Sequence, residues 1–340
     1  MLLSLVIPVY NEVEALPILL ATIRAVTAAT DFGYEILFVD DGSADGSVDL
    51  LKEAAAEDPR VKVLRFSRNF GHQAAITAGL DFATGDAVAV MDADLQDPPE
   101  LLPEMVNLVR QGYDVVSPQR VTRSGENLFK RKSASLFYWL MRKMVNERVP
   151  AEVGDFRMFN RRAIAAIRQL REQHRFMRGM VAWLGLREII IPFHRQARVA
   201  GQTKYPTWKM LRFAWTAISS FSALPLRLSI FLGLLTTLCG IGYGAYSVFA
   251  ALVLNMTVPG WTSLICLNIV FSGTTMIAVG LVGEYVARLY EEAKGRPLYV
   301  VSETSNMEID EAHVAKGMML PRDQVITRPR HEVETYVSVR

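Results

Sequence analysis

The sequence has few cysteines and lacks two short motifs that mark common nucleotide-binding folds. Only two cysteines occur among its 340 residues. Cys239 and Cys266 lie in strongly apolar segments without the spacing of metal ligands, so we interpret both as packing residues. No G-x-G-x-x-G follows the first predicted strand and no G-x-x-x-x-G-K-[ST] occurs, which excludes the dinucleotide fingerprint and the P-loop. Any phosphate must be bound in another way.

The sequence also lacks an imbalance of charge. Lys and Arg number 37 and Asp and Glu 35, for a net charge of +2, which argues against a general nucleic-acid binder that relies on positive charge. The first residues, M-L-L-S-L-V-I-P-V-Y-N-E, have no basic segment before the apolar run, so no signal peptide is expected. The chain is long enough for one large domain or two ordinary ones.

Charge is absent from one long region, because no charged residue occurs between Arg227 and Glu284. Within it, residues 228–254 and 264–287 each reach the roughly 20 residues that a membrane-crossing helix needs. The segment between them, 255–263, is expected to be an external turn. A buried hydrophobic hairpin in a soluble protein is the alternative interpretation.

Basic residues flank this region on both sides and are absent from the turn. Those near its ends are Lys204, Lys209, Arg212, Arg227, Arg288, Lys294 and Arg296. Under the positive-inside rule both long flanks are cytoplasmic. The pattern therefore predicts a multi-pass protein of the inner (plasma) membrane with both termini in the cytoplasm, and residues 288–340 are expected to be a cytoplasmic tail.

Residues 208–227 have the pattern of an interfacial amphipathic helix, since Trp208 and Trp215 recur at helical spacing beside basic residues. Packing of this helix against the preceding domain is the alternative. Gly240 and Gly244 form a G-x-x-x-G pair in the first span, so the two spans can approach each other or neighbouring subunits closely. A homo-oligomer, dimer or tetramer, is expected.

Glu284 and Arg288 are four residues apart at the end of the second span. We expect them to form an i,i+4 ion pair and to take no part in catalysis.

The first 120 residues or so alternate short β-rich runs with helical patterns. The runs are L-L-S-L-V-I-P-V-Y, Y-E-I-L-F-V-D, V-K-V-L-R-F-S, D-A-V-A-V-M-D and Y-D-V-V-S-P. This βαβ series predicts an α/β domain over residues 1–207 with a mainly parallel sheet covered on both faces. Ligands of such sheets bind beyond the carboxyl ends of the strands, where these runs end in polar residues.

An acidic cluster follows the fourth run, in A-V-A-V-M-D-A-D-L-Q-D-P-P-E. If the chain is still extended, Asp92, Asp94 and Gln96 share one side, because their period is two. Two carboxylates and an amide oxygen suit Mg²⁺ or Mn²⁺. A solvated turn is the alternative for an isolated D-x-D, but Asp40 and Asp41 end another strand, which favours a functional site.

Several motifs occur in order before the two spans: V-I-P-V-Y-N-E, V-D-D-G-S-A-D-G-S, R-N-F-G-H-Q-A-A-I-T-A-G-L-D-F-A-T-G-D, M-D-A-D-L-Q-D-P-P-E, G-D-F-R-M-F and R-V-A-G-Q-T-K-Y. With them, about residues 1–300 resemble the polyprenyl-phosphate glycosyltransferases, in particular the bactoprenol glucosyltransferase subgroup, which is related to dolichol-phosphate mannose synthase. The resemblance implies a GT-A fold, a nucleotide-diphosphate sugar donor, a divalent cation and a lipid phosphate acceptor.

The resemblance also implies roles for individual residues. Asp92, Asp94 and Gln96 match the metal and donor-diphosphate site. The expected nucleotide-binding residues are Pro8, Tyr10, Asn11, Glu12, Asp40, Asp41, Arg198 and Lys204. Of these, Arg198 and Lys204 match a basic segment that closes on the diphosphate, with a solvated cluster near the membrane as the alternative. Capping of the next helix is the alternative for Asp40.

On the acceptor side, the resemblance concerns three residues. Arg120, Arg131 and Ser135 match the residues with which the family binds the acceptor phosphate. Arginine suits this role because its planar fork binds phosphate oxygens bidentately. Asp155 matches a proposed catalytic aspartate and, with Asp94, is expected to carry the catalytic roles. A turn or helix cap is the alternative for Asp155, and Arg157 is a candidate ion-pair partner for it.

The reaction expected from this resemblance is inverting transfer of glucose from UDP-glucose to undecaprenyl phosphate on the cytoplasmic leaflet. N-acetylhexosamine, mannose or a modified sugar is the alternative donor sugar. A processive polysaccharide synthase is disfavoured because no Q-x-x-R-W occurs and the spans are few. A non-catalytic nucleotide-sensing scaffold would need no acceptor loop, and a transporter is disfavoured because the spans lack buried charge.

Overall fold

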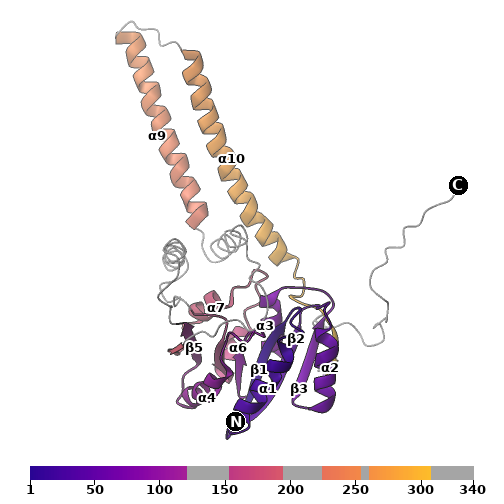
Figure 1. Cartoon of the computed structure of the whole chain (residues 1–340). Helices are drawn as coiled ribbons and strands as arrows, with labels where there is room; N and C mark the ends of the chain where they lie inside the picture. The colour runs from indigo at the N-terminus through magenta and orange to yellow at the C-terminus, as the bar shows by residue number, and fades with distance from the viewer. Residues whose placement is uncertain (121–152, 194–223, 254–259, 308–340) are drawn as a thin grey trace, which may run out of the picture.

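The computed structural model describes residues 1–120, 153–193, 224–253 and 260–307. They form an α/β domain from which two long helices extend (Figure 1). The amino terminus lies at the end of the domain away from these helices, so β1 runs toward them and its carboxyl end lies on the helix side (Figure 1).

One eight-stranded sheet forms the centre of the domain, in the order β7-β5-β6-β4-β1-β2-β3-β8. The strands are β1 (Leu2–Val9), β2 (Gly33–Asp40), β3 (Val61–Phe66), β4 (Ala87–Val90), β5 (Val115–Arg120), β6 (Arg157–Asn160), β7 (Glu188–Phe193) and β8 (Val301–Ser305). The pairs β1–β2, β1–β4, β2–β3 and β5–β7 are parallel. Of the strands within the described residues, only β6 and β8 run antiparallel to their neighbours. The predicted α/β class and mainly parallel sheet are confirmed.

Helices cover both faces of the sheet. They are α1 (Leu16–Thr27), α2 (Ser47–Glu57), α3 (His72–Phe82), the 3₁₀ turn η1 (Pro99–Leu101), α4 (Leu102–Arg110), α6 (Arg161–Ile167) and α7 (Met177–Leu184). In α1 the buried residues Leu16, Leu19, Leu20 and Ile23 recur at the spacing of one helical face.

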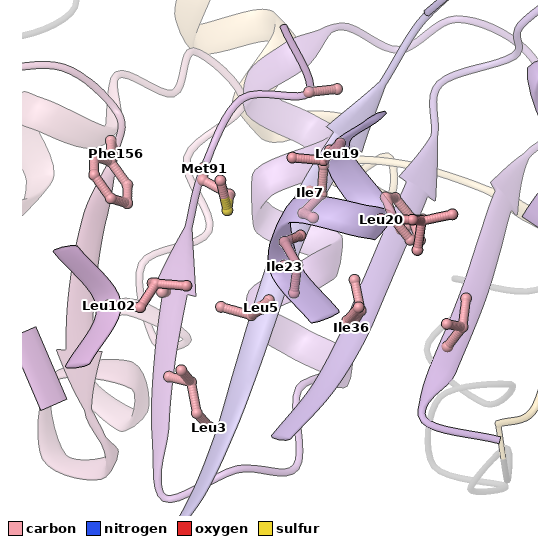
Figure 2. Close-up of a cluster of buried hydrophobic side chains, with 14 of the residues drawn as sticks. Leu3, Leu5, Ile7, Leu19, Leu20, Ile23, Ile36, Met91, Leu102 and Phe156 are labelled. Atoms are coloured by element: carbon pink, nitrogen blue, oxygen red, sulfur yellow. The ribbon is translucent and has the colours of Figure 1, made fainter. Parts of the chain in front are cut away.

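The side chains of β1 alternate between two cores, which explains its nearly continuous apolar sequence. Leu3, Leu5 and Ile7 are fully buried in the cluster that contains α1. Figure 2 shows them among the side chains of that cluster. Val6, between them, belongs to the cluster on the opposite face, with α3. A helix on each face is therefore required to bury this strand.

Helix α3 lies close to β1 at Gly79. A Cβ atom at this position would lie 2.1 Å from Cγ1 of Val6. No real pair of carbon atoms tolerates that separation, so only glycine allows the helix to lie this close to the strand. The first turn of the same helix carries residues of the candidate site, which makes this contact a determinant of the site's geometry.

The segment after the second long helix differs from the plain tail expected from residue 288. Strand β8 pairs with β3 and forms one edge of the sheet. Tyr299 is fully buried, stacks on Phe66 with ring centroids 5.2 Å apart and donates its hydroxyl to Asp81 at 2.7 Å. Residues 298–307 therefore belong to the α/β domain, and the expectation of a tail is wrong for them.

The two long helices are α9 (Leu224–Val253) and α10 (Gly260–Ala293). Within them, Leu226–Ala250 and Leu267–Ala293 are long and apolar enough to cross a membrane, and each contains an apolar stretch of 18 residues of which 0% is buried in the structure. This argues against the alternative of a buried hairpin. Helix α10 continues beyond the predicted end of the second span at residue 287.

The helices pack on each other at one of the two predicted glycines. A Cβ atom on Gly240 would lie 2.5 Å from Cζ of Phe271, whereas Gly244 has open space around it. Near the end of α10, Arg288 donates to Glu284 at 2.9 Å, which confirms the predicted i,i+4 pair. Most of the predicted interfacial helix, 208–223, lies outside the described residues.

Replacement of Gly79 tests the close contact between α3 and β1. We expect Gly79→Ala to lower the free energy of unfolding by about 1–3 kcal/mol, because the new methyl group overlaps Val6. Thermal unfolding of the detergent-solubilised protein measures this. Val6→Ala removes the overlapping methyl groups. The double variant should therefore lose less free energy of unfolding than the sum of the losses in the two single variants. Additive losses would contradict the contact.

Candidate active site

The loops that follow β1 and β2 are joined by hydrogen bonds at the carboxyl edge of the sheet. Asn11, with a φ of 57°, accepts from the Ala44 backbone N–H at 2.8 Å, and its own N–H donates to the Ser43 hydroxyl at 3.0 Å. The N–H of Glu12 donates to the Ser47 hydroxyl at 3.1 Å. Four of the predicted nucleotide-binding residues therefore lie on one edge: Pro8, Tyr10, Asn11 and Glu12.

Asp40 ends β2, Asp41 follows it, and both are buried. Asp40 accepts from the Ser43 N–H at 3.2 Å and lies 3.7 Å from Nε of Arg65. It does not cap helix α2, because Gly46 holds that position and no side chain caps it. Asp41 accepts from the N–H groups of the loop before α3. Burial raises the pKa of both carboxyls.

The contacts of Asp41 fix the start of α3. Its carboxylate accepts from the Phe70 N–H at 2.6 Å and from the Gly71 N–H at 2.9 Å. Gly71 has a φ of 101°, which favours glycine. The end of β2 therefore positions the first turn of α3.

The acidic cluster after β4 is held by a turn. Strand β4 ends at Val90, and Leu95 has a φ of 59°, so the chain is not extended through this cluster. The condition for the predicted period of two is therefore not met. Asp94 accepts from the Gln96 N–H at 3.1 Å. Gln96, like Asp92, is partly exposed.

Asp97 belongs to this cluster but was not among the predicted site residues. It is 1% exposed and accepts from the Asp92 N–H at 3.2 Å. Its second oxygen has no hydrogen-bond partner and lies 3.6 Å from the Arg120 guanidinium. Burial and the charge of Asp92 raise the pKa of Asp97 to about 7. Burial, with the charges of Asp155 and Asp94, also raises the pKa of Asp92.

Asp155 is oriented by three side chains from two helices. Arg178 of α7 donates to one carboxylate oxygen at 3.0 Å, and Gln73 of α3 donates to the other at 3.3 Å. The imidazole Nε2 of His72 lies 3.5 Å from the same second oxygen. Burial raises the pKa of Asp155, but the interactions with His72 and Arg178 outweigh it and hold the pKa well below its usual range.

The expected partner of Asp155, Arg157, is not within ion-pair distance of it. The Arg157 side chain is 1% exposed, and its nearest carboxylate is Glu188 at 3.7 Å. Arg157 lies within β6, opposite Val90, whereas Asp155 precedes the strand. The pairing proposed from their proximity in sequence is therefore wrong, and Arg178 is the partner.

His72 links the acidic cluster to Asp155. Its Nε2 lies 3.6 Å from Asp92 and 3.5 Å from Asp155. Burial lowers the pKa of His72, but the two carboxylates outweigh it and raise the pKa. His72 and Gln73 were missed as site residues, although they stand in the motif R-N-F-G-H-Q that carries part of the family resemblance.

The structure thus brings the predicted metal and catalytic residues to one edge and places Arg120 beside them. Gly154 allows this approach, because a Cβ atom there would lie 3.1 Å from the Arg120 guanidinium. Arg131, Ser135, Arg198 and Lys204 lie outside the described residues. The described site can bind a cation through its carboxylates and an anion through Arg120.

Known proteins resemble this chain over much of its length. Residues 4–168 match the model of Glycosyl transferase family 2. An uncharacterized glycosyltransferase of Bacillus subtilis is 43% identical over 90% of this chain and 94% of its own. A prophage-derived bactoprenol glucosyl transferase of Shigella flexneri is 38% identical over 89% of this chain and 98% of its own.

Among solved structures, glucosyl-3-phosphoglycerate synthase of Mycobacterium tuberculosis, in complex with Mn²⁺, UDP and glucosyl-3-phosphoglycerate, aligns with a TM-score of 0.44. It is 16% identical over 64% of this chain and 77% of its own, a likeness too distant to bear on the site. The family match and the mostly parallel sheet together establish the GT-A fold. With close relatives along nearly its whole length, the chain belongs to glycosyl transferase family 2.

Proposed function

We propose that this protein transfers glucose from UDP-glucose to the phosphate of undecaprenyl phosphate, with inversion, at the cytoplasmic face of the membrane. The observation that carries the proposal is the 38% identity, over 89% of the chain, to a bactoprenol glucosyl transferase. The site supports it, since the acidic residues lie at and just after the carboxyl ends of β2 and β4, and the carboxyl end of the parallel strand β1 lies on the side from which α9 and α10 extend (Figure 1).

The oxygen atoms that the site offers as ligands fit a divalent cation. Asp92 and Asp97 have raised pKa values in part because like charges lie close together, and a cation relieves that repulsion. Among the described residues no group of three or more His, Cys, Asp and Glu could hold a metal. Two carboxylates with an amide oxygen leave positions for water and donor phosphates, as Mg²⁺ prefers.

Asp92, Asp94 and Gln96 would hold Mg²⁺ or Mn²⁺. When bound, the ion supplies positive charge that stabilises the departing nucleoside diphosphate. The nucleotide would lie against the loops after β1 and β2. Arg198 and Lys204 would close on the diphosphate from the segment that follows β7.

The acceptor needs little activation. A phosphate monoester has a second pKa of about 6 and is largely ionised at neutral pH, so its oxygen can attack the anomeric carbon without a strong base. Arg120, with Arg131 and Ser135, would bind this phosphate. Asp155 is a poor base because its pKa is low. This favours a role in orienting the acceptor or stabilising positive charge at the anomeric carbon.

Helices α9 and α10 would anchor the protein in the inner membrane, with both termini cytoplasmic and the short connection outside. Residues 208–227 would lie along the membrane surface, and dimers or tetramers would form through the helices. This arrangement presents the site to a lipid phosphate in the cytoplasmic leaflet.

A donor panel tests the reaction and its metal dependence. Purified protein is incubated with undecaprenyl phosphate, Mg²⁺ or Mn²⁺, and UDP-glucose, other UDP-sugars or GDP-mannose, and the lipid product is identified by mass. We expect a hexosyl phospholipid, abolished by chelator and reduced at least about 100-fold by Asp92→Ala or Asp94→Ala.

Arg110→Ala is the matched control, because it breaks the exposed Arg110–Asp31 pair, which lies outside the carboxyl-edge site. It should leave the rate unchanged. If N-acetylhexosamine or mannose were transferred in place of glucose, that sugar would be assigned as the one that the protein transfers. Activity that survives chelation would refute the metal site, and the absence of transfer from every donor would favour a nucleotide-sensing scaffold.

Asp155→Asn separates binding from chemistry. The amide keeps the size of the side chain but removes its charge, so we expect UDP binding to persist while kcat falls at least about 100-fold. Calorimetric titration with UDP and Mn²⁺ measures UDP binding, and the lipid product assay measures kcat. Retained turnover would remove Asp155 from the reaction.

A further inference from the structure

The cytoplasmic end of α10 touches the loop that leads into α7. The Gln173 backbone N–H donates to Glu292 at 2.7 Å, and the Gln173 side-chain amide donates to the Arg296 carbonyl at 2.6 Å. Beside them, His174 Nε2 lies 2.7 Å from a carboxylate oxygen of Glu291. We name this set of contacts the α10 clamp. It connects a predicted membrane helix directly to the α/β domain.

The loop held by the α10 clamp continues into residues that orient Asp155. Met177, the first residue of α7, donates its N–H to the Gln73 side chain at 2.9 Å, and Gln73 donates to Asp155. The next residue, Arg178, donates to the other oxygen of Asp155 at 3.0 Å. Only three residues separate His174 from Arg178, so the start of α7 cannot shift without moving the partners of Asp155.

A second set of contacts connects α3 to the two segments that flank the clamp. Asp81, near the carboxyl end of α3, accepts from Arg171 at 2.8 Å and from the Tyr299 hydroxyl at 2.7 Å. Arg171 precedes the clamped loop, and Tyr299 follows α10. The first turn of α3 carries His72 and Gln73, so the same helix contacts residues that flank the clamp at one end and Asp155 at the other.

We propose that Gln173 and His174 are positioning residues for sugar transfer, and that their contacts with Glu291, Glu292 and Arg296 at the end of α10 orient Asp155 through α7. This inference rests on the proposed role of Asp155. The membrane helix then sets the geometry of the reaction centre and is more than an anchor.

The clamp is suited to positioning more than to stability. The Glu291 and His174 side chains are 55% and 30% exposed, and such pairs typically contribute little to the free energy of folding. Misplacement of a reacting group by about 1 Å can cost about 100-fold in rate. Mutations that alter coupling between sites typically act over about 2–30-fold, which is the range we expect here.

The experiment removes the two contacts that Glu291 and Glu292 make, at helix positions that alanine favours, and leaves the hydrogen bond from Gln173 to the Arg296 carbonyl. We expect Glu291→Ala/Glu292→Ala, in the full-length protein, to lower kcat about 5–30-fold with the KM for UDP-glucose within about twofold. Glu292→Gln keeps an oxygen that accepts from Gln173 and should retain near-normal kcat. Glu284→Ala is the matched control, since it breaks a pair within α10 itself.

A double-mutant cycle shows whether the clamp acts through α7. In an Arg178→Ala background the same double substitution should cost less activity than in the wild type, because one of the two contacts through which it acts is already lost and only the Met177–Gln73 hydrogen bond remains. Equal losses in both backgrounds would overturn the proposal. Unchanged kcat would also overturn it, as would a change confined to the KM for the lipid. A fall in kcat accompanied by a fall in melting temperature would overturn it as well, if Glu284→Ala produced the same two changes.

This result is separable from the proposed function. If the wild-type protein transfers no sugar to the lipid, the proposed function fails. If the wild type is active and chelator-sensitive while the clamp variants behave like Glu284→Ala, only the positioning role fails.

Discussion

Negative charge concentrates at the carboxyl edge of the sheet, and the rest of the site is arranged around it. Asp92, Asp94 and Asp97 follow one strand within six residues, and burial with mutual repulsion raises the pKa of two of them. Asp155 approaches from a different strand but has the opposite shift, because His72 and Arg178 lie against it. The site therefore contains one group of acids that a cation would stabilise and one acid already compensated by the protein.

This division of charge gives the carboxylates different chemistry. The acids after β4 have an unpartnered oxygen on Asp97 and partly exposed carboxylates beside it. Asp155 has donors on both oxygens, which fix its direction. Compensation by side chains from α3 and α7 makes the orientation of Asp155 depend on how these helices pack, and hence on contacts far from the reacting atoms.

Local patterns predicted the features that depend on neighbouring residues in the sequence. The apolar runs located the strands, the polar residues after them located the edge where the candidate site residues lie, and the gap in charge located α9 and α10. Family resemblance added Asp155. The partners of Asp155 could not be found in this way, since Arg178 lies 23 residues further along the chain. Proximity in sequence favoured Arg157, whose side chain is buried within β6 toward Glu188.

The same reasoning explains why β8 was missed. The run V-S-E-T-S is short and partly polar, and its pairing with β3 joins residues more than 230 positions apart. The late position of β8 in the sequence also determines when the sheet can be completed during synthesis. Strand β3 leaves the ribosome long before β8, which follows both apolar helices in the chain. Until those helices have been made, the outer edge of β3 has no partner strand, and an unpaired edge invites association with other chains. Completion of the sheet therefore waits for translation of α9 and α10, the two helices that are long and apolar enough to cross a membrane.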